Sequence, residues 1–238
     1  MPSQTLNPAD YGLLDNPIWN ALTTSHAHLA LGASTAQARR YPIEIGPLSG
    51  LREPTTEAFA ELAAIIPDGD IAILFLEEIP QLPSGWQLLR GGTLVQMLCP
   101  TIPDAVPTAE VIAPLEDADY AEMLALATLT EPGPFRSHTA ALGGFLGIRV
   151  EGRLAAMAGR RLAPGAFVEV SAVCTHPDFR GRGYARALVA AVTSNIYADG
   201  LTPFLTAFES NTGAISVYKQ LGYLLRRTLE LQVLKPPA

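Results

Sequence analysis

The segment from residue 167 to residue 192, FVEVSAVCTHPDFRGRGYARALVAAV, constrains the fold more than any other part of the chain. It predicts a buried strand, a tight glycine turn over Arg180–Ala185 and an amphipathic helix. The helix is predicted because apolar residues recur at i, i+3, i+4, i+7 and i+11 from residue 185. In the strand, alternation predicts that Glu169, Ser171 and Val173 face one side and Val168, Val170 and Ala172 the other.

The glycine turn is suited to a phosphate ligand. Gly181 and Gly183 lack a Cβ, so the backbone there is able to approach a ligand closely. The first turn of the following helix has unpaired amide donors and the positive end of the helix dipole. Two other phosphate loops do not fit, because a Rossmann fingerprint requires glycine where Arg186 stands and a P-loop requires a Gly-Lys-Ser/Thr sequence that is missing. The remaining alternative is a strand–turn–helix crossover whose glycines serve packing alone.

The turn resembles a known family signature. Arg180-x-x-Gly183-x-Ala185 matches the Q/R-x-x-G-x-G/A motif of the GCN5-related N-acetyltransferases (GNAT), and residues 173–185 resemble their FR47-like branch. The resemblance implies acetyl-CoA as co-substrate, with its diphosphate held by the turn and no metal required. The implied diphosphate residues are Arg180, Gly181, Arg182, Gly183, Tyr184 and Ala185.

The resemblance also implies a place for the thioester. In this family the central strand diverges from the next parallel strand, and its free edge pairs with the pantetheine arm. Here that edge is Val173, Cys174 and Thr175, with a backbone amide near Val173 polarising the thioester carbonyl. Asn211 corresponds to the family's asparagine on the CoA side.

Two residues are candidates for catalysis. Tyr218, seven residues after Asn211, matches the family's general acid; the alternative is a core aromatic on the apolar stripe of its helix. Glu169, eleven residues before Arg180, matches the glutamate that serves as base in histone-acetylating members. A carboxylate desolvated in an apolar strand holds a proton more tightly, as such a base must. The alternative is a charge at a solvated strand end, or an ion pair with Arg160 or Arg161.

Other nucleophile and metal sites are less well supported. Cys174 could be a nucleophile only with a histidine or positive field beside it, and His176 is separated from it by a proline-bounded turn, so packing is the expected role. His26 and His28 lack a nearby third ligand. Acceptor recognition is expected from residues 130–138, from Arg226 and from the N-terminal half.

The chain is predicted to form two parts. Four prolines between residues 100 and 114 indicate a connector. We therefore expect an N-terminal α/β domain over residues 1–106, of unassigned function and compatible with a diverged second copy of the same fold, and an acetyltransferase domain over 107–238. In the second part the predicted order is β-α-β-β-β-α-β-α-β plus one short helix near 130–142, an α/β (α+β) mixed sheet. A hairpin is expected to turn at Glu151-Gly152, Gly200 to end one helix, and Asn211 or Thr212 to cap the next.

In the first half, patterning predicts two helices and two strands. One helix is expected to be capped by Asn16 and to begin at Pro17, and another is expected to be capped by Thr55. A strand is expected over Ile71–Leu76, and Gly91-Gly92 is expected to turn the chain before a strand over Thr93–Cys99.

Composition narrows the function. The net charge of −7 argues against a nucleic-acid partner, and 48% hydrophobic with 16% charged residues is typical of a globular protein. Two cysteines make no disulfide framework, and neither a signal peptide nor a membrane-spanning stretch is apparent, so a cytoplasmic location is expected.

The expected reaction is acetyl transfer from CoA to a primary amine, on a small molecule or a peptide, by direct attack. Three alternatives stay open. The chain could be an acyl-CoA:amino-acid (glycine-type) N-acyltransferase, a non-catalytic acyl-CoA sensor, or an enzyme acetylating a protein terminus or lysine, for which a wide acidic groove is expected.

Overall fold

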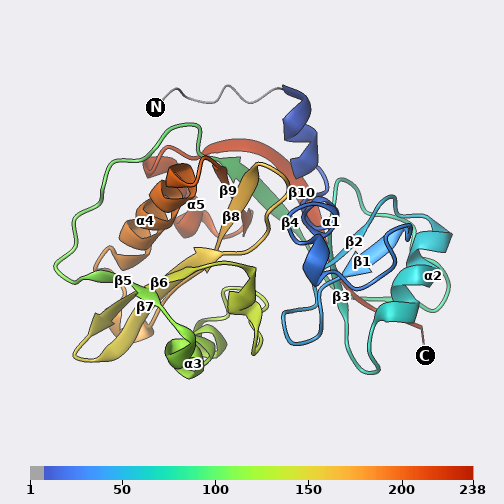
Figure 1. The fold of residues 1–238 in the computed structure, drawn as a ribbon, viewed down its shortest axis with the longest axis horizontal. Coiled ribbons are helices and arrows are strands. Elements are labelled where there is room, and N and C mark those ends of the chain that lie inside the picture. The colour runs from blue at the N-terminus through green and yellow to red at the C-terminus, as the bar shows by residue number, and fades with distance from the viewer. Residues whose placement is uncertain (1–7, 238) are drawn as a thin grey trace.

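The computed structural model describes residues 8–237; residues 1–7 and 238, at the ends of the two expected domains, lie outside it. The described chain is built on one mixed sheet of eight strands in the order β3-β10-β4-β9-β8-β7-β6-β5 (Figure 1). A separate two-stranded sheet pairs β1 (Ala38–Arg40) with β2 (Ser49–Leu51). The α/β class with a mixed sheet is confirmed.

The element order predicted for the C-terminal half is confirmed. The strands and helices are β5 (Ile112–Leu115), α3 (Tyr120–Thr130), β6 (Phe145–Val150), β7 (Arg153–Arg160), β8 (Phe167–Thr175), α4 (Tyr184–Ala198), β9 (Thr202–Phe208), α5 (Thr212–Gln220) and β10 (Leu224–Lys235). This half also has three short 3-10 helices. They cover Asp117–Asp119, directly before α3, Thr139–Leu142, before β6, and Pro177–Phe179, after β8.

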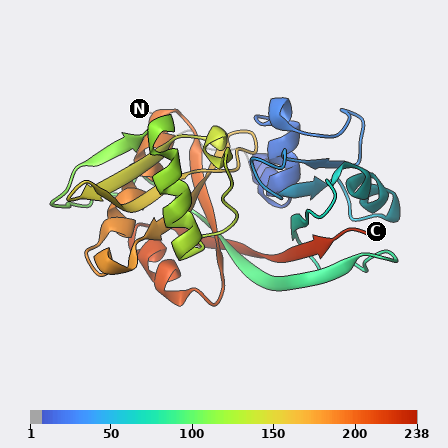
Figure 2. The ribbon, with the colours of Figure 1, turned by 90° about the horizontal axis from the view of Figure 1, so that it is seen from below.

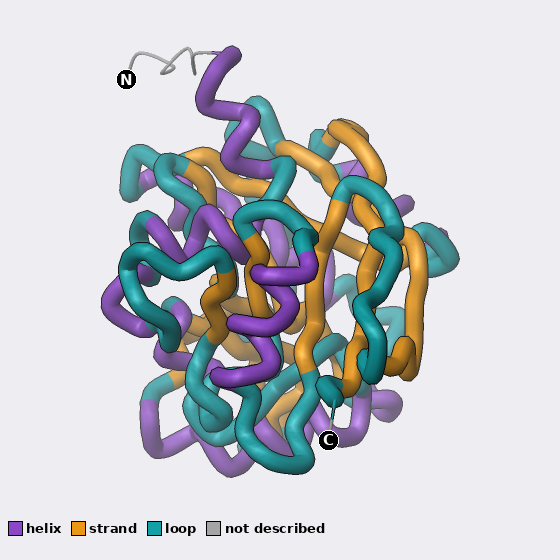
Figure 3. The backbone as a smooth tube through the Cα atoms, turned by 90° about the vertical axis from the view of Figure 1, so that its right-hand side faces the viewer, coloured by secondary structure: helices purple, strands orange, loops and turns teal. Residues whose placement is uncertain are grey.

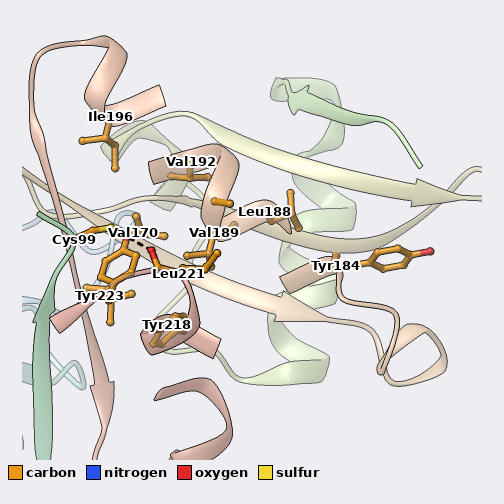
Figure 4. Close-up of a cluster of buried hydrophobic side chains, with 14 of the residues drawn as sticks. Cys99, Val170, Tyr184, Leu188, Val189, Val192, Ile196, Tyr218, Leu221 and Tyr223 are labelled. Atoms are coloured by element: carbon orange, nitrogen blue, oxygen red, sulfur yellow. Dashed lines mark hydrogen bonds between the residues drawn. The ribbon is translucent and has the colours of Figure 1, made fainter. Parts of the chain in front are cut away.

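Helices cover both faces of this half of the sheet. The apolar stripe of α4 packs on one face, where Leu188, Val192 and Ile196 are buried against Val170 and Tyr223 (Figure 4). Helix α3 packs on the opposite face, where Met123 is buried against Met157. The view from below shows α3 in front of the strands (Figure 2).

The N-terminal half adds two strands to the same sheet. Strand β4 (Gln87–Leu98) lies between β9 and β10, antiparallel to both, and β3 (Ala72–Leu76) pairs with the outer edge of β10. The long β4–β10 ribbon carries the sheet from one half into the other (Figure 2). The rest of this half, which faces the viewer in Figure 3, includes 3-10 helices at Pro8–Leu14 and Ala27–Leu29, α1 (Pro17–Thr23) and α2 (Thr56–Ile65).

The two predicted N-terminal helices are confirmed, and so is one of their caps. The hydroxyl of Thr55 accepts a hydrogen bond from the Ala58 amide at 3.2 Å, while Asn16 instead donates its side-chain amide to the Leu51 carbonyl at 2.7 Å. The division of the chain at residue 107 stays a prediction. Any such division cuts through a continuous sheet, because β4 precedes the cut and both of its partners follow it.

The turn predicted at Gly91-Gly92 is wrong, because β4 runs straight through both glycines. Gly92 serves close packing instead. A Cβ on Gly92 would lie 3.0 Å from the ring of Phe208 on the neighbouring strand. A glycine inside a strand often marks such a close approach, which sequence alone does not distinguish from a turn.

The alternation predicted for the central strand fails after Ser171. The register of β7 against β8 shifts between the pairs Met157↔Cys174 and Gly159↔Ser171, so Ala172 and Val173 together oppose one residue. Ala172 takes the left-handed conformation with φ +49°. This β-bulge inverts the pattern, so that Val173 packs toward α4 beside Val170, and Ala172 packs toward α3.

Candidate active site

The two central strands diverge at the bulge. Strands β8 and β9 pair in parallel only from Phe167↔Thr202 to Glu169↔Phe204, although both continue further. A cavity of about 740 Å³ occupies the opening, bordered by residues 170–173 of β8 and 206–208 of β9. This volume is typical of small-molecule sites. The opening therefore provides a slot through the middle of the sheet.

The glycine turn lies at the end of β8, at the start of α4. Gly181 and Gly183 both have φ +79°, and a Cβ on either would meet no atom within 4 Å. Gly183 is the N-cap of α4 and has no side chain to pair with the first amides of the helix. The turn is thus open to solvent, both glycines have a positive φ, and the first backbone amides of α4 are available as hydrogen-bond donors. A diphosphate site requires these features.

Two arginines flank this turn and are exposed. The Nε of Arg180 donates to the Thr175 carbonyl at 3.4 Å, and the Arg182 guanidinium lies 5.2 Å from the ring centroid of Phe179. Tyr184, the first residue of α4, is buried, and its ring points away from the other labelled side chains (Figure 4). The turn is not itself part of the cavity wall, so the structure places it beside the slot rather than within it.

Tyr218 lies on the cavity wall together with Val173 and Asn211. The residue is 8% exposed, and no hydrogen bond to its hydroxyl is found among the described residues. Burial raises the pKa of Tyr218 to about 12. Its neighbour Tyr223, 6.1 Å away between ring centroids, differs in having a hydroxyl 2.6 Å from that of Thr193 (Figure 4). Tyr218 therefore combines a core ring with a hydroxyl that the fold itself leaves unused.

Asn211 has a structural role as well. Its Oδ1 accepts a hydrogen bond from the Ala214 amide at 3.2 Å, so it caps α5 and fixes the helix that bears Tyr218. The sequence left the cap open between Asn211 and Thr212, and the structure shows that it is Asn211, which also borders the cavity.

Cys174 does not line the cavity. It is buried in the cluster between β8 and α3, and burial raises the pKa of its thiol to about 11. A protonated, buried thiol is inert as a nucleophile at neutral pH, so its side chain has the packing role that the sequence favoured. Both cysteines are free.

Glu169 forms a buried ion pair. Its carboxylate is fully buried and accepts two hydrogen bonds from Arg161, from Nε at 2.7 Å and from Nη2 at 2.9 Å, and one from the Thr206 hydroxyl at 2.6 Å. This is the arrangement that the sequence left open as the alternative to a base. Arg160, the other candidate partner, pairs with Asp199.

Arg161 is the site residue that the sequence did not single out. Its side chain borders the cavity. No described hydrogen bond uses its Nη1, which lies 3.7 Å from the Cβ position that Gly133 would have. Burial lowers the pKa of the Arg161 guanidinium, but the charge and hydrogen bonds of Glu169 have the larger effect together, so that this pKa is raised.

The acceptor region predicted from topology is partly supported. Residues 130–135 border the cavity, whereas Arg136 turns away and binds Asp70 with Nη2 at 2.6 Å. Arg226 binds Asp15 at 2.6 Å and is outside the cavity wall. The N-terminal half does line the cavity, through residues on one face of β3 and β4 and through Leu48.

Neither a metal centre nor a membrane segment is found in residues 8–237. No group of three His, Cys, Asp or Glu side chains is placed to hold a metal ion. The His26 Nδ1 instead lies 2.8 Å from the Tyr41 hydroxyl. Within the same range no helix is both long enough and apolar enough to cross a bilayer.

Comparison with known proteins agrees with this geometry. The FR47-like protein family matches residues 145–231. A protein from Novosphingobium aromaticivorans, assigned to the GNAT family of acetyltransferases, has a crystal structure that superimposes with a TM-score of 0.87 at 36% sequence identity, over 94% of this chain and 99% of that one. A GCN5-related N-acetyltransferase from Kribbella flavida, 17% identical with a TM-score of 0.62 over 93% of this chain and 96% of its own, shares the fold.

A similarity over part of the chain is found with an acetyltransferase of Yersinia enterocolitica, 37% identical over 57 residues. The match covers 24% of this chain and 40% of that relative's length. The sequence identity of 36% to the Novosphingobium protein extends over 94% of this chain. Together with the strand opening and the glycine turn, it establishes the family. The chain belongs to the GNAT acetyltransferase family, which uses an acyl-CoA co-substrate, and it has an FR47-like region in its C-terminal half.

Proposed function

We propose that the protein is an acetyl-CoA-dependent N-acetyltransferase that moves the acetyl group to a primary amine by direct attack. The observation that carries the proposal is the cavity at the β8–β9 opening, where Val173 and Tyr218 share one wall. The glycine turn at the end of β8 would hold the CoA diphosphate, and the free edge of β8 would pair with the pantetheine arm.

The reaction follows from these positions. The neutral amine attacks the thioester carbonyl carbon, and a backbone amide near Val173 stabilises the oxyanion. The carbon–sulfur bond then breaks, and the leaving thiolate takes the proton of the Tyr218 hydroxyl. The amine loses a proton to water in the open cavity, and the Tyr218 phenolate regains a proton from that water, which restores the enzyme. We prefer water to Glu169 as the acceptor of this proton, because the carboxylate oxygens already bind Arg161 and Thr206.

An enzyme is preferred to a non-catalytic acyl-CoA sensor because of Tyr218. A sensor needs the glycine turn but has no use for an unpaired hydroxyl in the cavity wall. The cytoplasmic location expected from the sequence is part of the proposal and is supported by two free cysteines.

A thiol-release assay tests the proposal. Purified protein is mixed with acetyl-CoA and a panel of amines, and with longer acyl-CoA donors in parallel. Release of CoA that depends on both an amine and the enzyme, fastest with acetyl-CoA, supports the proposal. CoA binding without turnover on any amine would favour the sensor, and preference for a longer donor would favour the glycine-type acyltransferase.

A further inference from the structure

Two features of the cavity bear on the chemistry of the acceptor. The first is an arginine inside the slot that already has a buried counter-charge. Glu169 and Thr206 bind the Nε and Nη2 side of Arg161, and this leaves the Nη1 side next to Gly133, which borders the cavity. The side chain is held at 11% exposure, so its orientation is fixed by the pair rather than by solvent. An arginine so held presents donors in a fixed plane, which suits a carboxylate.

The second feature is an apolar wall beside this arginine. The Arg161 guanidinium lies 5.7 Å from the ring centroid of Phe75 on β3. The neighbouring strands of the N-terminal half and β10 add further apolar side chains to the cavity, which are Ile71, Ile73, Leu94, Leu231 and Val233. Such a surface stabilises an apolar group of the ligand by removing it from water.

The charges along the cavity point the same way. Its lining holds two arginines, Arg90 and Arg161, and one carboxylate, Glu131. Among the described residues no carboxylate lies within ion-pair distance of Arg90, which stacks 5.0 Å from the ring centroid of Phe208. Counted together with Glu169, which pairs with Arg161, these charges balance, so the cavity is not acidic although the chain has a net charge of −7. A lysine or protein-terminus acceptor would be expected to have an acidic groove.

The position of Arg161 next to the opening sets how far its ligand can lie from the reacting atoms. Its backbone amide donates a hydrogen bond to the Glu169 carbonyl at 3.0 Å. Glu169 is the last residue of β8 that pairs with β9 before the two strands diverge. A carboxylate on Arg161 would thus lie at the entrance of the slot that receives the thioester. The amine must be close to that carboxylate, as it is when both are attached to one carbon.

We infer, on the basis of the function proposed above, that the acceptor is a free α-amino acid with a large apolar side chain. The Nη1 side of Arg161 binds its carboxylate, the wall formed by β3, β4 and β10 receives its side chain, and its amine faces the thioester. Glu169 is then a positioning residue that orients Arg161 and balances its charge. In the reaction the amine nitrogen gains the acetyl group and loses one proton, and CoA leaves as the thiol.

Matched acceptors test the inference on the wild-type protein. Leucine, leucinamide and isoamylamine share the apolar body, and only leucine has the carboxylate; glycine has the carboxylate without the body. We expect kcat/KM for leucine to exceed that for leucinamide and isoamylamine by about 10- to 150-fold, the range for a hydrogen bond to a charged group. Leucine should also exceed glycine by at least about 10-fold.

The outcomes separate this inference from the proposed function. Turnover that is equal or faster without the carboxylate, or fastest with glycine, overturns the inference and leaves the acetyltransferase in place. Absence of turnover on any amine, with CoA bound, overturns the proposed function. A readout independent of turnover is calorimetric titration of the CoA-loaded protein with N-acetyl-leucine and N-acetyl-leucinamide, in which only the carboxylate should bind measurably; equal binding would contradict the role of Arg161.

Variants then assign the preference to one arginine. Arg161→Gln alone would leave the Glu169 carboxylate buried without a counter-charge, which strongly destabilises a fold. The double variant Arg161→Gln/Glu169→Gln is therefore used, because it removes both charges and keeps similar side-chain volumes. We expect the double variant to lose the preference for leucine over leucinamide while its affinity for CoA is unchanged. Arg90→Gln, at the other arginine of the cavity, should keep the preference. Loss of the preference in Arg90→Gln alone would refute the assignment to Arg161.

Discussion

Removal of one hydroxyl from Tyr218 should separate catalysis from stability. Tyr218→Phe keeps the ring in the core between α5 and the sheet and deletes only an oxygen without a hydrogen-bond partner among the described residues. The free energy of unfolding at pH 7 should change by less than about 0.5 kcal/mol, because no buried partner loses its bond. The value of kcat should fall by about 10²-fold or more, because the leaving thiolate loses its proton donor.

The pKa of Tyr218 bears on this role. At about 12 it keeps the hydroxyl protonated throughout the neutral range, as a general acid requires. An ordinary thiol has a pKa of about 8.5, so transfer to a fully hydrated thiolate would be uphill. The thiolate of CoA, however, would form in the same desolvated slot, where desolvation raises the pKa of the thiol. The difference between the pKa of Tyr218 and that of the thiol is then smaller.

The same pKa gives a stability signature. In the folded protein this pKa lies above the unfolded value of about 10, so below pH 10 the hydroxyl is protonated in both states and its titration does not affect the stability. As the pH rises from 10 to 12 the hydroxyl ionises first in the unfolded chain, and the folded protein loses stability. The shift corresponds to about 2 to 3 kcal/mol. The wild-type protein should therefore lose more stability than Tyr218→Phe between these two pH values.

Tyr223→Phe is the matched control. This variant removes a hydroxyl bonded to Thr193 in the same cluster, so unfolding should become easier by about 1 to 3 kcal/mol, with kcat little changed. The measurements are steady-state thiol release and chemical denaturation on both variants. Wild-type kcat in Tyr218→Phe across the pH range, or a loss of stability there as large as in Tyr223→Phe, would refute the reasoning.

Three further results are expected. Glu169→Gln, assayed over a full pH–rate profile, should keep the position of the acidic limb, since the carboxylate pairs with its arginine; a displaced limb would show that it is the base. Cys174→Ala should keep most of its turnover, because burial raises the pKa of this thiol to about 11, and total loss in a folded variant would revive a covalent mechanism. Gly50→Ala should lower the melting temperature by several degrees, as its Cβ would lie 2.5 Å from the Trp19 Cα, whereas Gly12→Ala, with no atom within 4 Å, should not; equal melting temperatures would contradict this packing.

The sequence predicted the C-terminal half well because its signals are local. The hairpin at residues 151–152, the glycine turn before α4 and the caps at Asn211 and Gly200 each depend on a few neighbouring residues. The pairing of β4 with β9 and β10 depends on residues more than a hundred positions apart, and no short pattern encodes it. The continuous sheet was therefore not predicted, nor was the extent to which the N-terminal half forms the cavity.

The site shows the same division. The phosphate turn and Tyr218 follow from a motif, whereas the role of Glu169 depends on which arginine the fold brings to it. The bulge at Ala172 was also missed, because alternation looks regular in the letters and the extra residue shows only against the partner strand. The bulge decides which side chains face α4 and which face α3, so this miss affected the assignment of Val173 and Ala172.

The most direct test of the account is whether the corner at Gly181 and Gly183 holds CoA. Calorimetry with the wild-type protein should detect CoA binding. Asparagine tolerates the left-handed conformation, so Gly183→Asn and Gly181→Asn should fold and lose at least about 10-fold in affinity, because their side chains would enter the diphosphate position. Gly200→Asn, with φ +75° and equally open space at the far end of α4, is the control and should bind CoA as the wild type does. Absence of CoA binding by the wild type, or undiminished binding by both corner variants, would contradict the account.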